Sequence, residues 1–134
     1  MKEVWERWEP VEDFPETIYL ESLVDGKNGL TLVFETEDSN TKIIINFDSH
    51  VLSYKNTDEG DIFETWRNLS KNFGDEFYTK WALFKVRKSS YLKWFLRGTP
   101  GKWSEKDIEH FVFKTPADVI EVLSNYSPTI EIQV

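Results

Sequence analysis

Alternating apolar and polar residues in the first half of the chain predict a series of β-strands. In the stretch TIYLESLVDG, for example, Ile18, Leu20 and Val24 fall on one face, which is the two-residue period of a strand. Polar turn residues such as DGKNG separate one such stretch from the next. The pattern predicts four strands joined by short turns, at residues 17–26, 30–35, 42–48 and 51–54.

The spacing of apolar residues then changes and predicts a helix from Asp58 to Gly74. Trp66, Leu69 and Phe73 recur three and four residues apart, as on one face of a helix. Asp58 is a suitable N-cap, and Gly74 can end the helix in the left-handed conformation.

The second half of the chain predicts shorter elements of both kinds. Ser89 or Ser90 can cap a short helix that ends at Gly98. The pattern predicts a strand at residues 81–88, a helix at 89–98, a strand at 109–114 and a final strand at 129–134.

The stretch TPADVIEVLSNYSP carries the clearest helix signal of the chain. Thr115 serves as N-cap, Pro116 occupies the first helical position, and Asp118 completes a carboxylate variant of the capping box. The apolar residues that follow have helical spacing, at Val119, Val122, Leu123 and Tyr126.

These elements predict one α+β domain that spans residues 1–134, a length typical of a single domain. Consecutive strands with short turns form an antiparallel meander. We therefore expect a largely antiparallel sheet with an N-terminal meander and about three helices on one face.

Charge is distributed unevenly along the chain. The net charge is −8, but residues 1–64 alone carry −11 and residues 65–103 carry +7. An acidic total argues against general binding to nucleic acids or anionic membranes. No apolar run of 18 residues predicts a membrane span, and the acidic N-terminus does not resemble a secretory signal. We expect a soluble cytoplasmic protein.

Few residues offer catalytic or metal-binding chemistry. The chain has no cysteine, and its two histidines, His50 and His110, lack the spacing of a metal site or a hydrolase motif. We expect His110 to alternate outward from a core-facing Phe111. With 24 acidic residues, two carboxylates are almost certain to lie close together by chance. The number of acids therefore does not support a glycosidase mechanism, which needs such a pair. We predict no metal, no cofactor and no enzymatic activity.

Basic and aromatic residues alternate between residues 80 and 103. Such a mixture is typical of surfaces that bind single-stranded nucleic acid. The aromatic residues follow strand and helix periods, however, so we expect them to lie in the core with the basic residues facing solvent.

The N-terminal stretch WERWEPVEDFPE combines aromatic and acidic residues. Trp5 or Trp8 could anchor a partner within a rim of acids, since aromatic residues are frequent interface hot spots. Alternatively, Trp5, Trp8 and Phe14 fold back onto the sheet, and only the acids remain outside. The second arrangement is the more favoured one for the tryptophans.

Four phrases together resemble a known group of proteins: WERWEPVEDFPETIYLESLVD, SYKNTDEGD, SSYLKWF and EHFVFKTPADVIEVLS. The group consists of small, acidic, cysteine-free proteins of Bacillus-like bacteria, encoded beside polymorphic or contact-dependent growth inhibition toxins and regarded as their immunity proteins. The resemblance spans nearly the whole chain. It implies that the protein binds one cognate toxin domain and blocks its active site, and it supplies no catalytic residues.

An immunity function agrees with the charge, because carboxylates can mimic phosphates and attract a basic, nuclease-type toxin domain. We expect a monomer or weak dimer. Two alternatives remain, a regulatory or nucleic-acid-binding module that uses residues 80–103 and a carboxylate-based hydrolase. The residues predicted to bind the partner are Trp8, Glu9, Glu12, Asp13, Glu35, Glu37, Asp38, Asp58 and Glu59.

Overall fold

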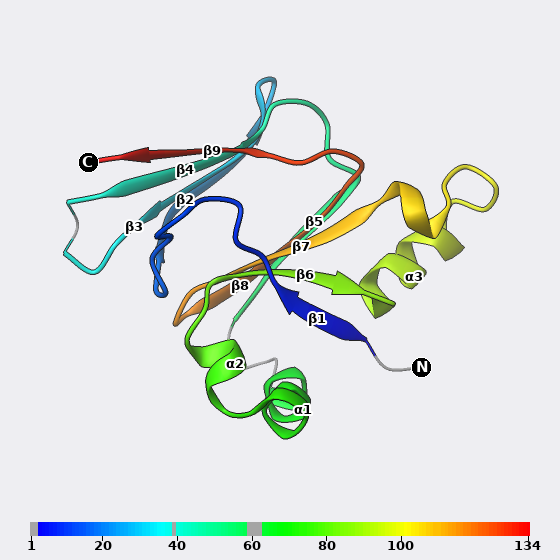
Figure 1. Cartoon of the computed structure of the whole chain (residues 1–134). Helices are drawn as coiled ribbons and strands as arrows, with labels where there is room; N and C mark the ends of the chain where they lie inside the picture. Colours follow the sequence, from blue (N-terminus) through cyan, green and yellow to red (C-terminus); the bar gives the residue numbers. More distant parts are fainter. Residues whose placement is uncertain (1–2, 39, 59–62) are drawn as a thin grey trace.

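In the part of the chain that the structure describes, nine strands form two antiparallel sheets that pack against each other (Figure 1). The computed structural model describes residues 3–38, 40–58 and 63–134. The five-stranded sheet has the order β1, β6, β7, β8, β5, formed by Val4–Arg7, Leu83–Arg87, Glu109–Lys114, Asp118–Ser124 and Ser53–Asp58. The four-stranded sheet has the order β2, β3, β4, β9, formed by Tyr19–Gly26, Gly29–Glu35, Lys42–Phe47 and Thr129–Gln133.

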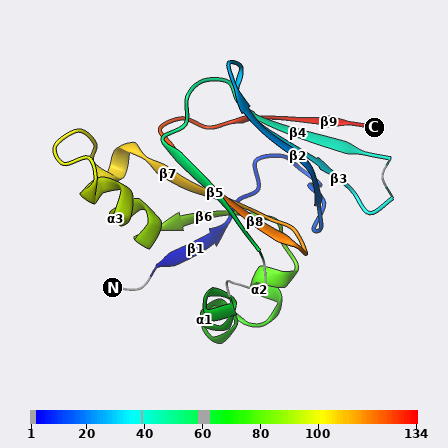
Figure 2. The same cartoon turned by 180° about the vertical axis from the view of Figure 1, so that it is seen from behind.

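Among the described residues, three α-helices border the five-stranded sheet (Figures 1 and 2). Helices α1 (Phe63–Phe73) and α2 (Glu76–Thr79) lie together on one side, and α3 (Ser90–Arg97) follows β6 at one end. A 3₁₀ turn, Glu105–Asp107, precedes β7. The prediction of an α+β domain with antiparallel strands and about three helices is therefore confirmed.

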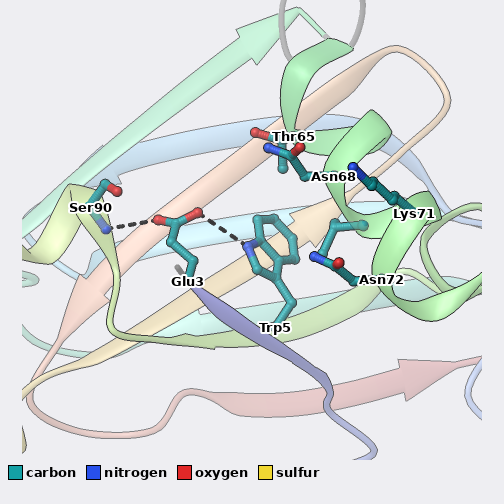
Figure 3. A pocket seen from close by; sticks show the side chains of 8 residues that line it. Glu3, Trp5, Thr65, Asn68, Lys71, Asn72 and Ser90 are labelled. Atoms are coloured by element: carbon teal, nitrogen blue, oxygen red, sulfur yellow. Dashed lines mark hydrogen bonds between the residues drawn. The ribbon is translucent and has the colours of Figure 1, made fainter. Parts of the chain in front are cut away.

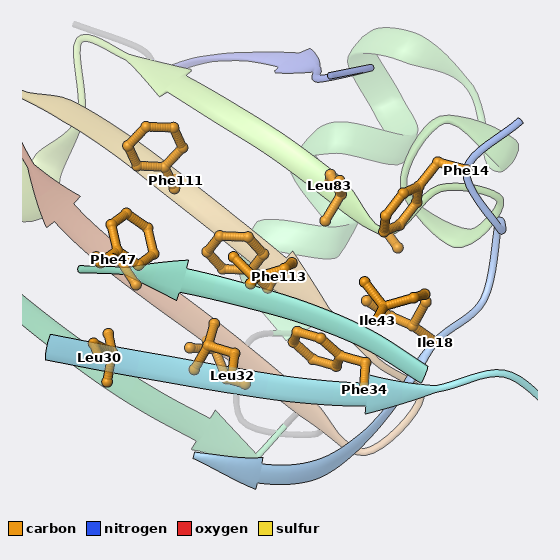
Figure 4. Close-up of a cluster of buried hydrophobic side chains, with 14 of the residues drawn as sticks. Phe14, Ile18, Leu30, Leu32, Phe34, Ile43, Phe47, Leu83, Phe111 and Phe113 are labelled. Atoms are coloured by element: carbon orange, nitrogen blue, oxygen red, sulfur yellow. The ribbon is translucent and has the colours of Figure 1, made fainter. Parts of the chain in front are cut away.

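The main core lies between the two sheets (Figure 4). Along β3 and β4, every second residue is buried, as the predicted alternation requires. Phe34 stacks on Phe113 of the opposite sheet, with ring centroids 6.3 Å apart, and Phe47 meets Phe111 edge-on at 5.6 Å. Aromatic rings therefore join the two layers and fix their separation.

A second core fills the other face of the five-stranded sheet. Leu69 of α1 and Tyr78 of α2 pack against Trp5, Phe84 and other residues of the sheet. The five-stranded sheet is therefore buried on both faces, and this explains where the prediction from sequence fails.

The helix predicted at residues 115–128 is wrong, because this segment is a β-hairpin turn followed by β8. All but the first residue of β8 are buried, since β8 lies between two cores. A strand covered on both faces loses its alternation and reads as a continuous apolar run. The hydroxyl of Thr115 accepts from the amides of Ala117 and Asp118, so the capping residues close a turn between β7 and β8 instead of starting a helix.

Other boundaries also differ from the prediction. Strand β5 extends through Asp58, so Asp58 is the last residue of a strand and not a helix N-cap. Residues 59–62, where the predicted helix begins, lie outside the described residues. Helix α1 and the left-handed Gly74 (φ 93°) after it are confirmed, as is Ser89 as N-cap of α3. Strand β1 and helix α2 were not predicted.

Candidate functional site

The connection between β1 and β2 is held against the protein by aromatic residues. Trp8 donates its backbone N–H to Leu83 (2.9 Å), and its half-buried ring packs 5.1 Å from Phe111. Phe14 is buried beside Trp81 at a centroid distance of 6.3 Å. Trp5 is likewise buried in the second core, so it cannot anchor a partner. The aromatic residues fold back, as the favoured alternative predicts, and they fix the backbone on which the acids stand.

The acids of this connection point outward. Glu9, Glu12, Asp13 and Glu16 are all exposed, and Asp13 adopts the left-handed region (φ 56°) that Asp tolerates in turns. No ion pair within the described residues involves any of these four carboxylates. Their negative charge is therefore left to solvent or to a partner.

The turn between β3 and β4 adds two more exposed acids, Glu37 and Asp38. The carboxylate of Asp38 accepts from the hydroxyl of Thr36 (2.6 Å) and from the backbone N–H of Asn40 (3.0 Å). The hydrogen bond from Thr36 is the largest cause that lowers the pKa of Asp38 below its ordinary value, and the one from Asn40 adds to it. Asp38 therefore stays ionised and holds the shape of the turn.

The two acidic segments meet in space. Glu16, from the connection, lines one shallow hollow together with Glu37 and Asp38 of the turn. We call the six exposed acids of these segments the acidic surface: Glu9, Glu12, Asp13, Glu16, Glu37 and Asp38. Elsewhere many carboxylates are engaged, such as Glu6 with Arg87 and Glu109 with Lys85. Other exposed acids, such as Asp48, Glu105 and Glu131, also have no ion-pair partner in the described residues, but they come from separate segments, whereas the acidic surface brings two acidic segments together.

The remaining predicted partner-binding residues do not join the acidic surface as free charges. Glu35 is paired with Lys42, which also contacts Glu21, so the charge of Glu35 is partly compensated. Asp58 belongs to the five-stranded sheet, where it pairs in register with Asp118. Glu59 lies outside the described residues. Glu16, in contrast, was not among the predicted site residues, although its position in the same acidic stretch was a sufficient signal.

A buried polar chain joins α3 to the five-stranded sheet. The hydroxyl of Ser89 lies 2.7 Å from Nδ1 of His110, and Nε2 of His110 lies 2.9 Å from Oε1 of Glu121. The same hydroxyl accepts the N–H of Leu92 as helix cap (3.0 Å). His110 is buried, so the predicted outward orientation is wrong. The reason is again that β7 has no solvent face.

The order Ser–His–Glu resembles a hydrolase triad, but its environment differs from that of an active site. Ser89 has no solvent-exposed surface, and its oxygen is occupied as the cap of α3. A nucleophile must reach its substrate. The hydrogen bonds of Ser89, His110 and Glu121 instead position α3 on the five-stranded sheet. The sequence does not predict these hydrogen bonds, because 21 residues separate Ser89 from His110 and no motif marks the pair.

Tyr91 extends this polar chain toward β5. Its hydroxyl lies 2.6 Å from that of Ser53, and its ring contacts His110 edge-on. Burial raises the pKa of Tyr91 above its ordinary value of 10.0, the Ser53 hydrogen bond opposes this change, and the charge of Glu121 adds to it.

Tyr91→Phe is expected to make the protein less sensitive to high pH. Because the pKa of Tyr91 is higher in the folded than in the unfolded state, unfolding releases a proton above pH 10. The stability that the neutral phenol provides is therefore complete below pH 10 and is lost as the pH rises through the folded-state pKa. Urea titrations between about pH 9 and 11 should show a shallower fall in the unfolding free energy of the variant. Equal slopes for both proteins would contradict this assignment.

A polar pocket of about 270 Å³ lies between the start of β1, helix α1 and the start of α3 (Figure 3). Its one described carboxylate, Glu3, accepts from the backbone N–H of Ser90 (2.8 Å) and from the indole of Trp5 (3.4 Å). The two-carboxylate mechanism of glycoside hydrolysis needs a second acid. Among the described lining residues none supplies it, so this pocket gives the hydrolase alternative no support.

In the described parts of the chain, no group of three or more metal-ligating side chains comes together, and no helix is long and apolar enough to cross a membrane. Comparison of the chain with models of known protein families, with curated proteins and with solved structures finds no match.

Proposed function

We propose that this protein is an immunity protein that uses its acidic surface to bind a basic toxin domain in the cytoplasm. The observation that supports the proposal is the acidic surface itself, in which six exposed carboxylates from two segments have no ion-pair partner in the described structure. A basic, nuclease-type domain presents the complementary charge, because its active site attracts phosphates. Carboxylates placed over such a site would exclude its substrate.

The way the acidic surface is built favours tight binding. Trp8 and Phe14 hold the connection on the core, and the hydrogen bonds of Asp38 fix the turn. Little conformational entropy then remains to be lost when a partner binds, so more of the electrostatic attraction appears as affinity. Charges of this kind also accelerate association, an effect that salt weakens.

Charge reversal on the acidic surface tests the proposal. The tagged protein is purified from its native host, and a stoichiometric basic partner that elutes only at high salt is expected. Glu12→Lys, Glu16→Lys and Glu37→Lys combined should weaken this complex by at least about tenfold, since close charge pairs across interfaces contribute about 1.5 kcal/mol or more. Isothermal titration of the purified partner gives the dissociation constant.

A matched variant reverses three exposed acids elsewhere, Asp48→Lys, Glu105→Lys and Glu131→Lys. It has the same net charge and should retain binding. An equal loss of affinity in both variants would mean that only the total charge matters for binding. That result would contradict the assignment of binding to the acidic surface. A protein that purifies alone, while the neighbouring toxin gene is expressed, would sink the proposed function.

A further inference from the structure

Helix α3 presents an aromatic residue and two cations to solvent. Leu92 is buried and Phe95 half-buried, so the opposite side of the helix, with Trp94, Arg97 and the half-buried Lys93, faces outward. Trp94 is 56% exposed, which makes it the most exposed aromatic residue in the described parts of the chain. The expectation that the aromatic residues between 80 and 103 lie in the core is therefore wrong for Trp94.

The exposed indole is held in a fixed orientation by a stack of groups beneath it. Its ring lies nearly parallel to that of Tyr91, with an interplanar angle of 27° and centroids 5.8 Å apart. The ammonium of Lys55 lies 4.4 Å from the centre of the Tyr91 ring. Since Tyr91 is itself fixed by Ser53 and His110, Trp94 is a preorganised flat surface and not a freely rotating side chain.

A hollow of about 390 Å³ adjoins this flat surface. It is lined by Trp94, Phe95, Arg97, Gly98 and Thr99. An aromatic wall and a guanidinium are groups that hold a planar heterocycle and its phosphate.

The charge around α3 has the sign that phosphates require. Residues 87–107 contain six basic residues and two acidic ones. Lys93, Arg97 and Lys102 take part in no ion pair of the described structure. Helix α3 and the turn between β3 and β4 lie at opposite ends of the molecule (Figures 1 and 2). The acids of this turn, Glu37 and Asp38, are therefore screened from α3 at physiological salt, where the Debye length is about 8 Å.

We infer that the outer face of α3 binds single-stranded nucleic acid. One base stacks on Trp94 in the hollow, and Lys93, Arg97 and Lys102 contact the neighbouring phosphates. An acidic peptide would match the charge but would leave the indole and the hollow without a planar partner. This site is separate from the acidic surface, and it does not depend on the proposed immunity function.

The test is fluorescence anisotropy with labelled oligothymidylate and oligouridylate of about 12 nucleotides, a length within the usual site size. Binding is expected at about 50 mM salt. Three phosphate contacts on a single strand predict that affinity falls about twentyfold between about 50 and 200 mM salt.

Trp94→Ala should weaken binding about tenfold without changing the salt dependence, because it removes stacking and no charge. Lys93→Gln with Arg97→Gln should instead reduce the slope of log K against log salt by about 1.4.

Matched controls come from α1 and the segment after α2. Phe73→Ala removes another exposed aromatic residue, one that stacks on Phe77, and Lys71→Gln with Lys80→Gln removes two other exposed charges. Both should bind as the wild type does. The inference is overturned if no oligonucleotide binds at low salt, if Trp94→Ala binds normally, or if polyglutamate competes equally well in the presence and absence of Trp94.

Discussion

Gly29→Ala is expected to destabilise the protein by at least about 3 kcal/mol, which places it among the most severe single substitutions. Gly29 begins β3 after the turn from β2 and has a φ of 91°. A Cβ added there would lie 1.9 Å from the backbone oxygen of Phe47 on the neighbouring strand β4. Backbone cannot move aside as the tip of a side chain can, so β3 and β4 would have to separate where their pairing begins.

Gly74→Ala is the matched control for this effect. Gly74 has nearly the same φ, 93°, but an added Cβ would have no heavy atom within 4 Å. It should cost only the left-handed strain, about 1–2 kcal/mol. Urea denaturation gives both free energies of unfolding. Equal losses would show that the contact with Phe47 is relieved at no cost and would contradict the explanation.

Glu121→Leu is expected to destabilise the protein by about 3 kcal/mol, because it removes one partner from a buried polar chain. Nε2 of His110 would lose its acceptor inside the sheet, and Lys55 would lose the carboxylate 3.6 Å away. A buried donor without a partner carries its full desolvation penalty. Leucine fills a similar volume, so the loss reports on the polar contacts more than on packing.

A double-variant cycle separates this explanation from a simple packing defect. His110→Leu combined with Glu121→Leu removes both buried polar groups, so it should cost clearly less than the sum of the two single variants. Urea denaturation of all four proteins gives the coupling energy. Strict additivity would mean that His110 and Glu121 act independently and would contradict the positioning role assigned to the chain.

The two proposed surfaces give the molecule opposite electrostatic ends. The acidic surface belongs to the connection between β1 and β2 and to the turn between β3 and β4, whereas the basic face belongs to α3. Charge alone along the sequence already indicated this division, with an acidic first half and a basic middle. The tests are independent, because the charge reversals at Glu12, Glu16 and Glu37 leave α3 unchanged, and the variants of α3 leave the acidic surface unchanged.

Local sequence patterns determined the outer layer of this fold. In the four-stranded sheet one face is buried, so strands β3 and β4 alternate and could be predicted from residues 30–35 and 42–48. Helix α1 could be predicted for the same reason, since only one side of it meets the core. The exposed acids of the acidic surface were also evident, because carboxylates without partners remain at the surface.

Only the tertiary structure decided the remaining features, because they depend on burial from two sides and on contacts distant in sequence. Strand β8 lies between two cores, so its residues are apolar on both faces and do not alternate with polar ones. The resulting spacing of apolar residues is the same as that of a helix. Ser89, His110 and Glu121 met only when β6, β7 and β8 paired. Trp94 is exposed because the sheet covers the opposite side of α3, which cannot be read from the apolar character of the residue itself.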